Sequence, residues 1–244
     1  MVHIQRITLF TCLAMIVGLT GCASTGEKSV DPLEGYNRAA HGFNDTLDRY
    51  VLKPVAKGYR VVTPNLVENG VNNFFGNLLE IRNVLNDVLQ WKWKQAGNDT
   101  GRFLVNSTVG IAGIFDVAKY ISLERNEGED FGQTLAVWGV GQGPYIVLPF
   151  LGPSNLRDTA GLPLDWVVDP VGYIEHVPTR NSTRAFSYVV GRAAVLDAEE
   201  FVSGDRYIFL REAYRQRRNY LISDGRVEDD FGDGDFESDE YDEY

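Results

Sequence analysis

Apolar residues recur three and four positions apart through most of the chain, which is typical of amphipathic helices. The first such stripe starts at Asp31-Pro32. Asp31 can cap the helix, Pro32 suits its first turn and Glu34 can complete a capping box. Pro54 is expected to end this helix. The apolar face consists of Leu33, Tyr36, Ala40, Phe43, Leu47 and Tyr50, and the polar face of Asn37, His41, Asn44, Asp45 and Asp48.

Further stripes predict that helices make up most of the chain. One follows Pro64 and continues to Leu89, with Gly70 and Gly76 as expected breaks. Asn98-Asp99-Thr100 has the residue types of a helix cap. It should open a helix over 103–120, and two more are expected over 183–196 and 205–222. The last of these carries four arginines, namely Arg211, Arg215, Arg217 and Arg218.

Residues 131–152 break the helical rhythm. β-Branched and aromatic residues stand on both sides of a glycine-rich stretch, a pattern that predicts a β-hairpin. Glycines without Cβ atoms should let this turn bend and accept close neighbours. Beyond it, Ser154 can cap a short helix, while residues 163–178 should be irregular and packed by Trp166 and Tyr173. The hairpin residues of interest are Gly139, Gly141, Gly143, Pro144, Tyr145, Leu148 and Pro149.

The first 22 residues have the pattern of an export signal. Arg6 precedes an apolar segment, 7–19, that is too short to remain as a membrane span. It ends in Leu19-Thr20-Gly21-Cys22, which resembles the bacterial lipobox, where cleavage precedes a diacylated cysteine. Cys22 is therefore the predicted lipidation site, and an ordinary signal peptide with a chance cysteine is the alternative. Ala23, in place of aspartate, favours the outer membrane.

Charge divides the chain into a nearly neutral body and an acidic end. The net charge is −11, which argues against nucleic-acid binding. Residues 226–244 hold ten carboxylates and one arginine, so they account for −9 of it and predict a disordered tail. We therefore expect a signal peptide at 1–21, a lipidated linker at 22–30, a helical domain at 31–225 and the tail at 226–244. No run of about 18 apolar residues follows the signal, so no mature spanning helix is predicted.

Residue patterns of known catalytic or cofactor sites are not found. The glycine-rich stretch lacks the lysine and hydroxyl residue of a phosphate loop, and no Gly-x-Ser-x-Gly motif occurs. His41 and His176 are too far apart in sequence to predict a metal site, so we expect no metal, cofactor or enzyme activity. The acidic run Glu124, Glu127, Glu129 and Asp130 is interpreted as a solvated loop. The four arginines form a solvated face or a site for lipid headgroups or a partner.

Several motifs in order resemble the MlaA (VacJ) lipoproteins, over about residues 31–222. The run Asp31-Pro32-Leu33-Glu34-Gly35-Tyr36-Asn37-Arg38 resembles the opening signature of the family, and the likeness is specific because several motifs follow it in order. The acidic tail is outside the recognised pattern. The other motifs are 76–78, 102–110 with 113–118, 130–135, 139–145 with 148–149, 154–158 and 211–214.

The resemblance implies a mainly α fold, a ring-like bundle of amphipathic helices with one glycine-rich hairpin. It also implies an outer-membrane channel that lies in the inner leaflet beside a trimeric porin. Misplaced phospholipids would leave the outer leaflet through it and pass to a periplasmic carrier of the MlaC type, which maintains lipid asymmetry. The hairpin is then the candidate gate. The candidate channel lining is Asn37, His41, Asn44, Asp48 and Asn106.

Two other functions remain open on the sequence. One is a lipid-anchored scaffold that only bridges a porin and periplasmic partners. The other is an anchored envelope hydrolase that uses the carboxylates of residues 124–130. The polar stripe of the first helix has a simpler alternative interpretation as a water-exposed face without a role in transport. The glycine hairpin likewise has the alternative interpretation of a packed turn that does not act as a gate.

Overall fold

The computed structural model describes residues 31–226, so the expected signal peptide, linker and nearly all of the acidic tail lie outside the described residues. The fold is mainly α-helical with one small antiparallel hairpin, as predicted. The helices are α2 (Glu34–Leu47), α3 (Lys53–Val62), α4 (Asn65–Leu89), α5 (Trp93–Thr108), α6 (Phe131–Val137), α7 (Leu156–Val168), α8 (Val177–Ala194) and α9 (Arg206–Ile222), and the strands are β1 (Tyr145–Leu148) and β2 (Gly152–Asn155).

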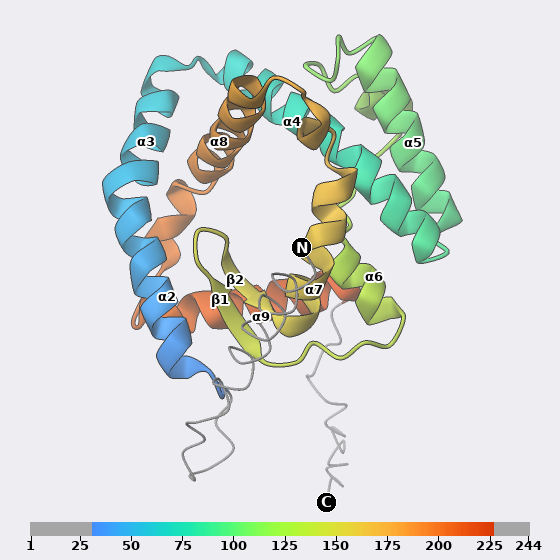
Figure 1. Ribbon diagram of the computed structural model, residues 1–244. Helices are drawn as coiled ribbons and strands as arrows, with labels where there is room; N and C mark the ends of the chain where they lie inside the picture. Colours follow the sequence, from blue (N-terminus) through green and yellow to red (C-terminus); the bar gives the residue numbers. More distant parts are fainter. Residues whose placement is uncertain (1–30, 227–244) are drawn as a thin grey trace, which may run out of the picture.

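The helices form a ring-like arrangement around the hairpin (Figure 1). In this view α2 and α3 run up one side, α4 crosses the top, α7 and α6 descend the other side, and α9 crosses the bottom. Helix α5 packs on the outside of α4, and α8 packs against α3. Within residues 31–226 no helix is both long and apolar enough to cross a bilayer.

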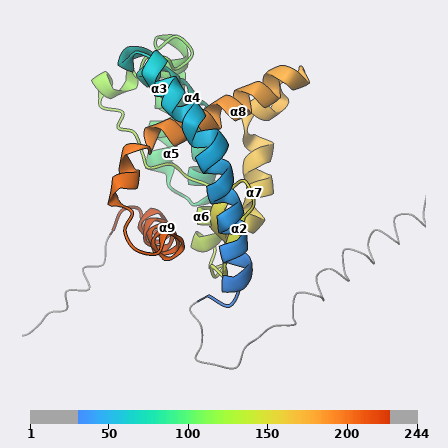
Figure 2. The same cartoon turned by 90° about the vertical axis from the view of Figure 1, so that its left-hand side faces the viewer.

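Helices α2 and α3 form one rod, so the prediction that Pro54 ends the first helix is wrong (Figure 2). A π-helical turn, Asp48–Leu52, joins them, and the Lys53 N–H donates to the Asp48 carbonyl five residues back. The wider turn places Pro54 in the first turn of α3, where its missing N–H is tolerated. The rod ends at Thr63, whose extended backbone is what a following proline requires.

The start of α2 also differs from the predicted capping box. The helix begins at Glu34, and Asp31 is buried below it. One Asp31 oxygen accepts from the Leu33 N–H at 3.1 Å and from the Asn37 amide at 3.0 Å. Asp31 thus fixes the segment that leads into α2 through these two hydrogen bonds.

Helix α4 is unbroken, which corrects the expected breaks at Gly70 and Gly76. A Cβ atom at position 70 would stand 3.1 Å from Ile114 Cγ2, and one at position 76 would overlap the Arg125 guanidinium. Both glycines therefore permit close approach of a neighbouring segment instead of ending a helix.

Helix α5 begins ten residues before the start predicted from Asn98-Asp99-Thr100. That motif lies inside the helix, with Asp99 fully buried. Asp99 accepts hydrogen bonds from the Asn98 and Asn126 amides at 3.0 and 2.6 Å instead of capping a helix. The helix ends at Thr108, and the turns that follow place Ile111 and Ala112 at positive φ.

The hairpin lies further along the chain than its predicted position. Residues 131–137 form helix α6, which Asp130 caps by accepting from the Gln133 N–H at 2.9 Å. Strand β1 pairs with β2 from Tyr145–Asn155 to Leu148–Gly152, so the turn is at 149–151. The glycine stretch 139–143 is the loop that precedes β1.

Regular structure also replaces the irregular segment expected at 163–178. Pro163 lies inside α7, a 3₁₀ turn covers Pro170–Tyr173, and α8 begins at Val177. Trp166 and Tyr173 are exposed instead of packing this segment.

Side chains cap the starts of both α7 and α9. Asn155, and not Ser154, caps α7 by accepting from the Asp158 N–H at 2.8 Å. Helix α9 matches the predicted range 205–222, and Asp205 caps it by accepting from the Tyr207 N–H at 2.9 Å.

The distribution of side chains is inverted relative to a water-soluble domain. Among the described residues 19 polar or charged residues are buried against 11 apolar ones, whereas 38 large apolar residues are exposed. All four tryptophans are among the exposed residues. An apolar exterior of this extent indicates a surface that contacts something other than water.

The interface between α4 and α5 illustrates this inversion. The buried face of α4 carries Asn77, Glu80, Asn83, Asn86 and Asp87, and not the apolar stripe that the sequence suggested. Arg102 of α5 donates to Glu80 at 3.2 Å. It also donates to both oxygens of Asp116 at 3.0 Å each. A buried guanidinium is stable here because its donors are bonded to carboxylates.

Candidate functional site

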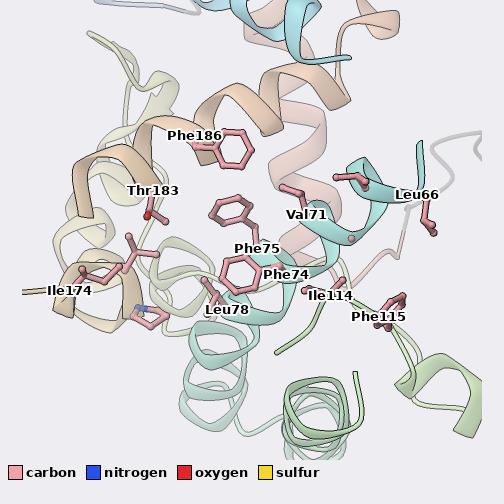
Figure 3. A pocket seen from close by; sticks show the side chains of 14 residues that line it. Leu66, Val71, Phe74, Phe75, Leu78, Ile114, Phe115, Ile174, Thr183 and Phe186 are labelled. Atoms are coloured by element: carbon pink, nitrogen blue, oxygen red, sulfur yellow. The ribbon is translucent and has the colours of Figure 1, made fainter. Parts of the chain in front are cut away.

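An apolar cavity of about 720 Å³ lies between α4, α8 and the turns around Ile114 and Pro170. Phe75 lies between Phe74 and Phe186 on its wall (Figure 3), with ring centroids 5.4 and 6.0 Å away. The one polar side chain of the lining is Thr183. Such a cavity fits hydrocarbon, because little in its wall can replace the hydrogen bonds of a polar ligand.

A second cavity of about 820 Å³ adjoins the first, between α4, α7 and α8. The two share Phe75, Leu78, Pro170 and Val171 in their linings. The second cavity also contains charged groups, which the first lacks. They are Arg82, Arg125, Arg184, Asp165 and Asp169.

The two carboxylates of the second cavity differ in how closely an arginine approaches them. Arg184 lies 3.5 Å from Asp169, whereas Arg82 Nε lies 4.0 Å from Asp165 without a hydrogen bond. Burial raises the pKa of Asp165 to about 6, and the carboxyl accepts from the Phe131 N–H at 3.1 Å. Together the two cavities form an amphipathic space.

Three of the five predicted lining residues face a third, smaller cavity of about 430 Å³ beside the hairpin. These are His41, Asn44 and Asp48. Burial lowers the pKa of His41, so its imidazole is neutral at pH 7. Asp48 accepts from Arg192 Nε at 2.7 Å, and its charge is therefore matched.

The asparagines of α2 hold the hairpin. Asn37 is fully buried, accepts from the Val147 N–H at 2.8 Å and donates to the Tyr145 carbonyl at 3.0 Å. Asn44 bonds in the same way to the Leu148 carbonyl and the Phe150 N–H, at 2.9 and 2.8 Å. These amides replace the ladder partners that a third strand would supply.

Asn106 is not brought together with the α2 residues. It is buried in α5, where it donates to Asp116 at 2.9 Å and accepts from the Ala118 N–H at 2.9 Å. These bonds fix the chain that follows α5.

The candidate gate divides into a loop and a hairpin. Gly139 and Gly143 have positive φ, whereas Gly141 does not. A Cβ atom at Gly143 would lie 3.0 Å from Leu156 Cβ, but one at Gly141 or Gly139 would meet nothing within 4 Å. The loop therefore packs closely against Leu156 at Gly143 and has free space around Gly141.

This difference gives a matched pair of variants. Gly143→Ala should lower the free energy of unfolding by about 1–3 kcal/mol, because alanine is strained at positive φ. Gly141→Ala should change it by less than about 0.5 kcal/mol. Denaturant unfolding of the purified protein measures both. Equal losses in the two variants would contradict this account of the loop.

The acidic run is only partly solvated. Glu124 and Glu127 are exposed, as predicted, but Glu129 is buried and accepts from Gln90 and Lys92 at 2.8 and 2.9 Å. Asp130 accepts from Arg218 at 2.6 and 3.0 Å. The two inner carboxylates therefore have structural partners.

The arginines of α9 do not form one solvated face. Arg218 is buried between Asp130 and Asp158, while Arg217 is exposed and only 3.5 Å from Glu127. Arg211 is largely buried and lies over the Tyr207 ring, 5.8 Å from its centroid. Of the four arginines, only Arg215 and Arg217 are therefore left for a headgroup or partner site.

Sequence reasoning missed the charged groups of the second cavity. Arg82, Arg125 and Arg184 come from three separate segments and form no motif. One available signal was Arg82, a charged residue within the apolar stripe of α4. Within residues 31–226 no group of three or more potential metal ligands is found.

Comparison with known proteins gives consistent matches. The model of the MlaA lipoprotein family matches residues 29–221. The intermembrane phospholipid transport system lipoproteins MlaA of Shigella flexneri and of Escherichia coli are each 37% identical over 217 residues, or 86% of both chains. That of Haemophilus influenzae is 32% identical over 240 residues, covering 90% of this chain and 92% of its own.

A solved structure matches as well. It is described as the structural basis for maintenance of bacterial outer membrane lipid asymmetry. It aligns with a TM-score of 0.70 at 36% identity and covers 79% of this chain and 98% of its own.

Proposed function

The chain belongs to the MlaA lipoprotein family, and on that premise we propose that it is the outer-membrane lipoprotein of an intermembrane phospholipid transport system and maintains outer-membrane lipid asymmetry. The resemblance drawn from the sequence motifs is confirmed by the family match. The proposed action is to take misplaced phospholipids from the outer leaflet and release them toward the periplasm.

The pair of adjoining cavities carries this proposal. A phospholipid combines two hydrocarbon chains with a phosphate-bearing headgroup, so a path for it needs apolar and polar walls side by side. The first cavity supplies apolar walls and the second supplies charged ones, with four residues common to both linings. Their combined size of about 1500 Å³ is of the order needed for one lipid molecule.

The apolar exterior supports a position within one leaflet. Val61 of α3, Trp91 just after α4 and Tyr120 in the turns after α5 are each at least 74% exposed, and they line none of the three cavities described above. Amphipathic helices without a spanning segment lie in the interface with their apolar faces among acyl chains. We propose that the ring lies in the periplasmic leaflet of the outer membrane.

Two partners belong to the proposal. A trimeric porin would hold the ring in the membrane, and a periplasmic carrier of the MlaC type would accept the lipid. The exposed apolar surface offers area for the first of these.

The alternative functions have less support. A hydrolase that uses residues 124–130 would need a pair of carboxylates in a sheltered site, but Glu129 and Asp130 are engaged by Lys92 and Arg218, and Glu124 and Glu127 are exposed. A pure scaffold would need no cavities of this size. The family is one of transport lipoproteins, and we propose that this chain performs no covalent chemistry.

Filling the apolar cavity should block transport. Val71→Trp places an indole in the cavity, so cells that carry this variant should accumulate phospholipid in the outer leaflet as strongly as cells that lack the protein. Val61→Trp, at an 85% exposed position on α3, is the matched control and should behave as the unmodified protein. Outer-leaflet phospholipid is measured by surface labelling, with protein level as the reference. Normal asymmetry with Val71→Trp at normal protein level would refute the cavity as the path.

The lipid anchor remains a proposal about residues outside the described part of the chain. Cys22→Ala should yield an uncleaved or soluble form, because the acyl chains have no attachment site. Mass spectrometry of the membrane fraction tests this in the unmodified protein. A mature chain that begins at Ala23 or later without acyl mass would contradict the anchor.

The gate is also still to be tested. The hairpin is held to α2 by Asn37 and Asn44, whereas the loop at Gly141 is open. We propose that movement of this loop, and not of the hairpin, controls passage. Gly141→Pro should then alter lipid traffic while the protein level stays normal.

A further inference from the structure

We propose that Arg82 and Arg125 together bind the phosphodiester group of a phospholipid in the second cavity, while its acyl chains occupy the first. This rests on the proposed function and adds a specific headgroup site to it. The two guanidiniums come from α4 and from the loop after α5, and both line the same cavity.

The position of Arg125 depends on an absent side chain. Any Cβ at position 76 would overlap the Arg125 guanidinium, so the guanidinium lies directly on the backbone of α4. Gly76, Leu79 and Arg82 follow at three-residue spacing and share one face of that helix, and all three line the second cavity. Glycine in the middle of a helix costs about 0.5–1 kcal/mol relative to alanine. Here it admits a charged group to the cavity wall.

The two arginines have donors to spare. Hydrogen bonds from Asn106 and Arg102 lower the pKa of Asp116 and occupy its oxygens, and Arg125 adds only the weaker attraction of a nearby charge. In the described part of the chain Arg125 forms no ion pair within 4.0 Å. Arg82 Nε is buried without a hydrogen-bond partner. A buried donor without a partner is costly, and an anionic oxygen in the cavity would satisfy it.

The charges in the cavity favour one monovalent anion. Three guanidiniums face two carboxylates, and Arg184 is paired with Asp169. One positive charge therefore remains on the side of Arg82 and Arg125, which matches a phosphodiester. Guanidinium groups bind phosphate oxygens through paired hydrogen bonds in a fixed geometry.

The neighbouring walls favour a lipid phosphate over a free one. Phe75 and Leu78 flank Gly76 in sequence and face both cavities. A phosphodiester on the two arginines thus lies next to the opening of the apolar cavity. Inorganic phosphate would satisfy the arginines and leave that cavity unused.

Binding of two matched lipids tests the proposal. The full-length, acylated protein in detergent is mixed with dioleoylphosphatidylglycerol and with dioleoylglycerol, which has the same chains and no phosphate. Retained lipid is measured by mass spectrometry after gel filtration. We expect the phospholipid to be retained at least about tenfold better, and Arg82→Gln with Arg125→Gln to remove that preference while dioleoylglycerol retention stays unchanged.

Controls separate charge, folding and ligand source. Arg49→Gln removes one arginine charge from the π-helical turn after α2, outside both cavities, and should keep the preference. Arg82→Lys with Arg125→Lys keeps the charge and should restore part of it. Inorganic phosphate at millimolar concentration should not displace the phospholipid.

Each result has a distinct meaning. An unchanged preference in the double glutamine variant would overturn the headgroup site, as would an equal loss of both lipids. Displacement by inorganic phosphate would make the site one for free phosphate instead. Failure of the unmodified protein to retain either lipid would count against the proposed transport function itself.

Discussion

Replacing Arg218 by methionine should lower the free energy of unfolding by about 3–5 kcal/mol, the usual result of removing one partner of a buried ion pair. Arg218 of α9 donates to both oxygens of Asp130, at 2.6 and 3.0 Å, and its Nε lies 2.7 Å from Asp158. Asp130 caps α6 and Asp158 lies in the first turn of α7. One guanidinium therefore joins three helices of the ring.

Arg217→Met is the matched control. Arg217 is the preceding residue, its side chain is 63% exposed, and its partner Glu127 is exposed as well. Loss of such a surface pair should change stability by less than about 1 kcal/mol. Denaturant unfolding in detergent compares the two variants. If both lose the same amount, the buried bridge does not hold the ring.

Arg218 also predicts a dependence on acid. Its guanidinium holds the pKa of Asp130 below the usual range, against the opposing effect of burial. The stability from this pair is therefore present above the unfolded-state pKa of about 4 and is lost as the pH falls through the lower folded-state pKa. Acid unfolding should become less steep in Arg218→Met.

A second large effect is expected at Asp87, where substitution should raise the free energy of unfolding instead of lowering it. Asp87→Asn should stabilise the protein at pH 8 by at least about 1.4 kcal/mol, the equivalent of one pKa unit. Burial, followed by the nearby carboxylates of Asp99 and Glu129, raises the pKa of Asp87 to about 8. Asp87 is fully buried and neither of its oxygens has a hydrogen-bond donor as partner. A neutral amide avoids the cost of ionising this group.

The direction of the change in stability with pH follows from the number of protons that the folded and unfolded states bind. Between pH 4 and pH 8 folded Asp87 holds a proton that the unfolded chain has released, so stability falls as the pH rises through this window. Asp87→Asn should flatten that fall, measured as the unfolding midpoint at pH 5, 6.5 and 8. Asp197→Asn is the control, because Asp197 is exposed and Arg60 lowers its pKa. A fall of the same steepness in Asp87→Asn would show that Asp87 is not the responsible group.

The sequence determined the class of structure and several local elements. Periodicity placed helices at α2, α4, α8 and α9, because side chains on one face of a helix share an environment whatever that environment is. The helix predicted over 205–222 is present as α9, and its cap Asp205 makes its hydrogen bonds within one turn. The ordered motifs identified the family, since they extend over nearly the whole helical domain.

Local patterns failed where the partner of a residue is distant in sequence. The sequence suggests Gly76 as a helix break, whereas in the structure the Arg125 guanidinium occupies the space that a side chain at position 76 would fill. The sequence suggests Asp99 as a helix cap, whereas in the structure it accepts a hydrogen bond from Asn126. The sequence suggests Asn37 as a channel-lining residue, whereas in the structure its amide is hydrogen-bonded to the backbone of the hairpin.

Tertiary structure alone decided which face of each helix is inside. A helical stripe shows that two faces differ, but it does not tell which of them meets the core. In α4 the polar face is buried, because Glu80 and Asn83 find partners in Arg102 and the Glu129 backbone. The apolar face is left for cavities and the exterior. Only the assembled ring brings Arg82 and Arg125 to one wall, since 43 positions of sequence separate them and no local rule couples residues at that distance.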